Sequence, residues 1–115
     1  MATSDFAQCD VVRYRFPTLA AAPASIGPAL IVSSGAVGED RSLPWVVMIT
    51  SAANRAWPGD VPLGAGYAEA GLPAPSVIRP AKIATIEAAH ADRQGCASAE
   101  IWAAVAARLK AHLGL

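Results

Sequence analysis

A short apolar run near the middle of the chain constrains the fold most strongly. Residues 46 to 49 read Val-Val-Met-Ile, a run that is too short for a helix and rich in β-branched side chains. Pro44 precedes the run, and the polar pair Thr50 and Ser51 follows it. We therefore predict a strand that is buried on both faces and that leaves the core at Thr50.

The flanking segments predict further strands. Residues 10 to 16 alternate apolar and polar side chains, as a half-buried strand does, and residues 29 to 33 form a second apolar strand that pairs with the central one. Residues 60 to 63 contain a proline, which suits a short edge strand. Residues 76 to 86 continue the strand pattern, but Pro80 removes a ladder donor and predicts a bulge or an edge at that point.

The remaining segments complete a single domain over residues 1 to 115. We expect a flexible arm over residues 1 to 8 and mobile, proline-containing loops over residues 17 to 28 and 64 to 75. Ser98 is typical of a helix N-cap, and apolar residues at a spacing of four predict a terminal helix over 98 to 113. The predicted fold is a small, strongly curved, mainly antiparallel β-sheet with a C-terminal α-helix.

Charge and cysteine content exclude several classes of protein. The 115 residues carry nine basic and nine acidic side chains, so any site for a polyanion must be local. Cys9 and Cys96 are isolated and no Cys/His cluster is present, so we expect inert thiols, no metal site and no cofactor. The N-terminus lacks a signal-peptide pattern, and no apolar run approaches about 18 residues, which favours a cytoplasmic protein without a membrane partner.

A candidate site follows the central strand. The hydroxyls of Thr50 and Ser51, with Arg55 and Trp57 in the next loop, are the groups that a site for a phosphate and a flat ring would use. Each also has a purely structural interpretation. The hydroxyls can end a strand by bonding nearby backbone, and Trp57 can pack on the rim of the sheet beside Pro58.

Six segments of the chain resemble the successive blocks of one known family. They are DVVRYRFP (10 to 17), GPALIVSS (27 to 34), VVMITS (46 to 51), WPGDVPL (57 to 63), PSVIRPAKIATIE (75 to 87) and SAEIWAAVAARLKAHLGL (98 to 115). In this order they resemble the MazF/PemK family of toxin endoribonucleases. The resemblance implies an SH3-like barrel, a homodimer, and a cognate antitoxin whose disordered tail occupies the RNA groove. It also implies metal-independent cleavage of single-stranded RNA by attack of the ribose 2′-hydroxyl.

The resemblance also assigns site residues. Thr50 and Ser51 match the family's Thr-Ser pair, and Arg79 lies where the PemK-like branch places a catalytic Arg. A lone Arg beside a proline on an edge strand is otherwise expected to be solvated. Lys82, the fourth catalytic candidate, can act as a base with a lowered pKa or as an ammonium that binds phosphate. The expected RNA-binding residues outside this set are Arg13, Arg15, Arg55 and Trp57.

Two positions depart from the family pattern. Gly27 stands where relatives commonly have Arg, and Ala81 stands where the PemK-like branch has Asp. Either other basic residues have taken over the chemistry or the cleavage activity is weak or lost. The alternative function, from a different class, is a catalytically degenerate barrel that binds an antitoxin peptide or another partner as a dimeric module.

Overall fold

A computed structural model describes residues 6 to 16 and 25 to 115, and this part of the chain forms six strands and one α-helix. The strands are β1 (Asp10–Phe16), β2 (Ser25–Val37), β3 (Leu43–Ser51), β4 (Val61–Pro62), β5 (Ser76–Thr85) and β6 (Ala91–Cys96). The α-helix is α1 (Ala99–Leu113), and three short 3-10 helices are η1 (Glu39–Arg41), η2 (Gly64–Tyr67) and η3 (Ala88–His90).

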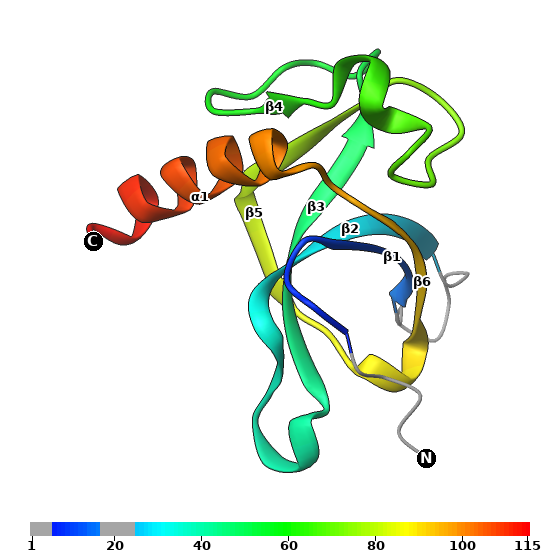
Figure 1. Ribbon diagram of the computed structural model, residues 1–115, viewed down its shortest axis with the longest axis vertical. Coiled ribbons are helices and arrows are strands. Elements are labelled where there is room, and N and C mark those ends of the chain that lie inside the picture. The colour runs from blue at the N-terminus through cyan, green and yellow to red at the C-terminus, as the bar shows by residue number, and fades with distance from the viewer. Residues whose placement is uncertain (1–5, 17–24) are drawn as a thin grey trace.

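All six strands belong to one antiparallel sheet in the order β4-β5-β3-β2-β1-β6. The sheet curls strongly, so that β1 and β6 lie over the open side of β2 and β3, while α1 runs beside β5 at one end (Figure 1). Because β4 and β6 are not paired with each other, the sheet is curled but not closed. The predicted fold class is confirmed.

The central strand separates two halves of the core. Val46 and Val47 of β3 have no exposed surface, and successive side chains of a strand point to opposite faces. Val47 packs with one apolar cluster that includes Val105 of α1, whereas Val46 packs with a second cluster that includes Phe6. The prediction of a strand buried on both faces is therefore correct.

A bulge interrupts β5 at Pro80. Val47 lies opposite Ile83 and Met48 lies opposite Arg79, so residues 80 to 82 have no partner on β3. Since proline cannot donate to a ladder, the break falls at a position where a regular pairing would lose a hydrogen bond. The predicted bulge is confirmed, and β4 pairs with the other side of β5 only at Val77 and Ile78, before the bulge begins.

Two expectations about the N-terminal half need correction. Strand β2 begins at Ser25, so the last four residues of the loop predicted over 17 to 28 belong to the strand, and residues 17 to 24 lie outside the described part. Pro28 is tolerated because the pairing of β2 with β3 starts only at the next residue. Of the expected arm, residues 1 to 5 are not described, and Phe6 is buried in the second cluster.

The terminal helix has a defined beginning and end. The Ser98 hydroxyl accepts a hydrogen bond from the Ile101 amide at 3.2 Å, and Gly114 closes the helix in the left-handed conformation. Val105 anchors α1 on the first apolar cluster. No helix within residues 6 to 16 and 25 to 115 is long and apolar enough to cross a membrane.

Candidate functional site

An open pocket of about 530 Å³ lies where β3 ends. Its floor comes from three adjacent strands, with Arg13 on β1, Gly27 on β2, and Thr50 and Ser51 on β3. The other lining residues are Pro28, Ile49, Gly71, Leu72, Pro73, Ala74, Pro75, Ser76 and Gln94. The structure thus brings the two predicted hydroxyls and one predicted RNA-binding Arg into a single pocket.

The wall of this pocket, residues 71 to 76, is held by direct contact of two backbones. Gly71 has φ +83°, and a Cβ added to it would lie 2.3 Å from the Gln94 carbonyl oxygen. A Cβ added to Gly95 would lie 2.6 Å from the carbonyl carbon of Ala70. The loop after η2 therefore lies against β6 at a distance that only glycine permits.

The hydroxyls at the end of β3 also bond to the turn that follows. Asn54 donates from Nδ2 to Thr50 Oγ1 at 2.6 Å, and the Ala53 amide donates to Ser51 Oγ at 3.1 Å. The structural interpretation of these residues is thus observed. These hydrogen bonds leave both hydroxyls able to bind a ligand. A hydroxyl that accepts one hydrogen bond still has a hydrogen to donate, for example to a phosphate oxygen.

Arg79 forms a buried ion pair with Asp60. Its Nε donates to Asp60 Oδ1 and its Nη2 to Oδ2, both at 3.0 Å, and each side chain is only 9% exposed. The register explains the pairing: Val61 lies opposite Ile78, so Asp60, the residue before β4, comes next to Arg79, the residue after Ile78 on β5. The side chain expected to be solvated is therefore among the most buried polar groups of the described residues.

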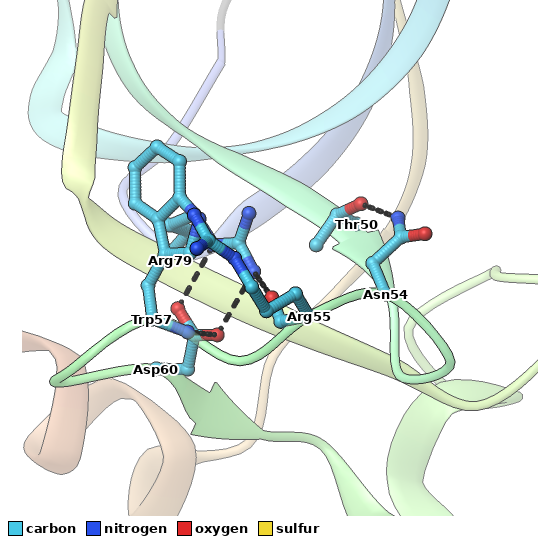
Figure 2. Close-up of polar contacts among 6 residues, drawn as sticks. All are labelled: Thr50, Asn54, Arg55, Trp57, Asp60 and Arg79. Carbon is cyan, nitrogen blue, oxygen red and sulfur yellow. Dashed lines mark hydrogen bonds and ion pairs between the residues drawn. The ribbon is translucent and has the colours of Figure 1, made fainter.

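The loop before β4 encloses the same guanidinium (Figure 2). The Arg55 carbonyl accepts from Arg79 Nη2 at 2.9 Å, and the guanidinium carbon lies 4.2 Å from the centroid of the Trp57 ring. The Trp57 amide donates to Asp60 Oδ2 at 2.9 Å. Hydrogen bonding from Arg79 lowers the pKa of Asp60 from its ordinary value. We call Arg55, Trp57, Asp60 and Arg79 the Arg79 clamp.

The clamp lies beside the pocket, and Arg79 is not one of the residues that line it. Thr50 lies opposite Val77 and Met48 opposite Arg79, so Thr50 and Arg79 are diagonal neighbours on one face. Such neighbours are about 7–8 Å apart. The hydrogen bonds of Arg79 to described residues use Nε and Nη2. No buried side-chain nitrogen in the described part lacks a partner, so Nη1 reaches solvent.

The other basic candidates occupy different places. Arg13 and Arg15 are exposed on β1, and neither forms an ion pair with another described residue. Lys82 is exposed in the bulge of β5 and does not line the pocket. Arg55 is an exposed residue, and its carbonyl accepts a hydrogen bond within the clamp. Trp57 is half-buried, with its ring against the Arg79 guanidinium.

Asp60 and Asn54 were not predicted as site residues. Asp60 belongs to the segment WPGDVPL, where an Asp three residues after Trp57 is typical of a turn, but nothing local indicates its partner on β5. Asn54 follows Thr50 by four residues and carries no signal beyond turn propensity.

Two positions depart from the pattern of the resembled family. Gly27 lines the pocket, whereas Ala81 is exposed in the bulge of β5. Among the described residues, no cluster of His, Cys, Asp and Glu could hold a metal ion.

Comparisons with known proteins agree with this architecture. A family model described as the PemK-like, MazF-like toxin of type II toxin-antitoxin systems matches residues 7 to 113. The fold is similar to a MazE-MazF structure from Deinococcus radiodurans, with 22% identity, a TM-score of 0.79, and coverage of 95% of this chain and 96% of that chain. No curated protein sequence gives a significant match.

Two mycobacterial structures share the fold as well. An endoribonuclease from a Mycobacterial species has 21% identity and a TM-score of 0.69, over 96% of this chain and 93% of that chain. The Mycobacterium tuberculosis toxin MazF-mt6 has 20% identity and a TM-score of 0.64, over 90% and 96% of the two chains.

Proposed function

The chain belongs to the PemK-like, MazF-like toxin family of type II toxin-antitoxin systems, and from this we propose that it is a metal-independent endoribonuclease that cleaves single-stranded RNA. The observation that carries the proposal is the pocket at the end of β3, where Thr50, Ser51 and Arg13 come together. Two hydroxyl donors and a guanidinium that forms no ion pair with a described residue are suited to a phosphodiester.

The proposed reaction is an internal transfer at phosphorus. The ribose 2′-oxygen loses its proton to a base and bonds to phosphorus, and the bond to the 5′-oxygen breaks as that oxygen gains a proton. The products are a cyclic phosphate and a free 5′-hydroxyl. In this scheme Thr50 and Ser51 donate to the non-bridging oxygens, Arg13 adds positive charge, and Arg79 offers Nη1 from the adjacent clamp.

The remaining basic and aromatic candidates are proposed to contact RNA outside the pocket. Lys82 is exposed on the same strand as Arg79, and Arg55 is an exposed member of the clamp, so both side chains can attract the RNA backbone. Trp57 has part of its ring covered by Arg79, so only its remaining surface is proposed to stack on a base.

Replacing Thr50 with Ala should lower the cleavage rate by about 10²–10³-fold, because one preorganised donor to the phosphorane is lost. The measurement is single-turnover cleavage of a long RNA in the presence of EDTA, with the 5′-hydroxyl ends of the fragments mapped by direct kinase labelling. Thr50→Ser is the matched control, since it keeps the hydroxyl and should retain most of the rate.

Two results would contradict this function. A Thr50→Ala protein that cleaves as fast as the native chain would remove Thr50 from the site. A folded native protein that binds RNA or a peptide but leaves every RNA intact would instead favour the degenerate binding module, which the departures at Gly27 and Ala81 suggest.

We propose a cognate antitoxin as the physiological partner and the cytoplasm as the place of action. The family consists of toxins of type II toxin-antitoxin systems, and a mycobacterial endoribonuclease in complex with its cognate antitoxin has the same fold. An antitoxin segment with acidic side chains would complement the cationic side of the pocket.

We further propose a homodimer that covers an apolar patch on β3 and β5. Trp45 and Ile83 are diagonal neighbours on one face and are 48% and 53% exposed. Placing a charge there with Ile83→Lys should raise the dimer dissociation constant by about 30-fold or more, as for a central interface residue. Sedimentation velocity measures the effect, and Leu115→Lys, at a residue that is 82% exposed, is the control. A native protein that is monomeric at all concentrations would contradict the proposal.

A further inference from the structure

A second pocket, of about 340 Å³, opens beside the first. It is lined by Arg13, Arg15, His90, Asp92 and Gln94. Arg13 and Gln94 line both pockets, so the two hollows are adjacent and share these side chains as their boundary. A ligand longer than one nucleotide that enters the first pocket can therefore continue into the second.

The register of β1 and β6 places these polar side chains on one face. Arg13 lies opposite Asp92, and residues two apart along a strand point to the same side. The opposite face of β1 carries Val12 and Tyr14, which are buried in the second apolar cluster. The second pocket is thus the outer surface of a strand pair whose inner surface is core, which gives it a rigid floor.

The second pocket carries an excess of positive charge. Arg13 and Arg15 are about 6.7 Å apart along β1, and neither lies within ion-pair distance of a described carboxylate. Asp92 is the only acidic residue among the five, so two guanidinium groups face one carboxylate. His90 adds an exposed residue whose ring centroid lies 6.4 Å from that of Tyr14.

We infer that this second pocket binds the nucleotide next to the cleavage site, an inference that rests on the proposed function. Arg15 contacts the flanking phosphate, and Arg13 lies between that phosphate and the scissile one. His90 offers a ring on which an unstacked base can lie, and Gln94 offers both a donor and an acceptor to a base edge at the boundary. The bound RNA strand therefore crosses β1 toward η3.

Binding of RNA of two lengths tests the inference. The probes carry deoxyribose at the scissile position, so that they bind but cannot be cleaved. One is a dinucleotide that fills only the first pocket, and the other is an octamer. Arg15→Ala should weaken octamer binding about 10-fold and reduce the slope of log K against log[salt] by about 0.7, while dinucleotide binding stays unchanged.

Arg108→Ala is the matched control, because it removes the same charge from an exposed residue of α1, a helix that extends away from β6 (Figure 1). The inference is overturned if Arg15→Ala and Arg108→Ala bind the octamer equally, or if Arg15→Ala weakens both probes alike. If the native protein neither binds nor cleaves RNA, the proposed function and the inference fall together. If the native protein cleaves RNA and Arg15→Ala binds the octamer as tightly as the native protein does, the proposed function stands and only the role of the second pocket is rejected.

Discussion

Replacing Asp60 with Ala should lower the free energy of unfolding by about 3–5 kcal/mol, which is the cost of leaving a buried charge without its partner. The Arg79 guanidinium is 9% exposed at the side chain, and two of its hydrogen bonds go to Asp60. Its stacking on Trp57 cannot replace a carboxylate, since a cation–π contact contributes about 0.5–2 kcal/mol. Urea unfolding followed by circular dichroism measures the loss.

Asp10→Ala provides a comparison at a different ion pair. Asp10 is buried and accepts from Arg93, but the Arg93 side chain is 58% exposed and can be solvated when the carboxylate is removed. The expected loss is therefore smaller, about 1–2 kcal/mol, mainly from the hydrogen bonds that Asp10 accepts. Equal losses for Asp10→Ala and Asp60→Ala would show that burial of the arginine does not set the cost.

The same ion pair gives a pH dependence with a defined sign. Because Arg79 lowers the pKa of Asp60 in the folded state, the stabilisation is fully present above the ordinary pKa of an Asp. It is lost as the pH falls through the lowered pKa of the folded state. An Asp60→Asn protein should lack this part of the acid-induced loss of stability.

Replacing Gly71 with Ala should destabilise the fold by about 2–5 kcal/mol and should slow RNA cleavage. An alanine at this position would have to adopt the left-handed backbone conformation at φ +83°, which costs about 1–2 kcal/mol. Its Cβ would also overlap the Gln94 carbonyl oxygen at a distance of 2.3 Å. Relief of the overlap moves the loop that forms the wall of the first pocket. Unfolding and single-turnover cleavage are measured on the same samples.

Gly64 offers a closely matched control. It also has a positive φ, +58°, but a Cβ added there would meet no atom within 4 Å. Gly64→Ala therefore carries the backbone penalty alone, about 1 kcal/mol, and should leave cleavage unchanged. If both variants lose the same stability, the contact between the loop and β6 is not what requires glycine at position 71.

The parts of the fold that depend on local sequence were predicted correctly. A β-branched run fixes β3, Pro80 fixes the bulge, Pro62 lies on the edge strand β4, and Ser98 begins α1. Each of these signals acts within a few residues of the structure that it determines. The start of β2 was missed, because its first residues are held only by pairing with β1.

The site was harder to predict, because its geometry depends on register between distant segments. The sequence indicates that Thr50 and Ser51 end a strand, and the resemblance indicates Arg79. Neither reveals that Asp60 lies next to Arg79, because this pairing depends on how β4 aligns with β5. The contact of Gly71 with Gln94 is missed for the same reason, since the two residues are 23 positions apart and no local pattern links them.

The three unpaired residues of the β5 bulge have a consequence for how such chains can diverge. On one side of the bulge β5 carries Arg79, and on the other it carries Ile83. An insertion or deletion within residues 80 to 82 would change only the length of the bulge. The pairing of β5 with β3 on either side of the bulge would keep its register. Descendants of this sequence can therefore change the end of β5 that carries Ile83, the proposed dimer contact, while the end that carries Arg79 is inherited intact.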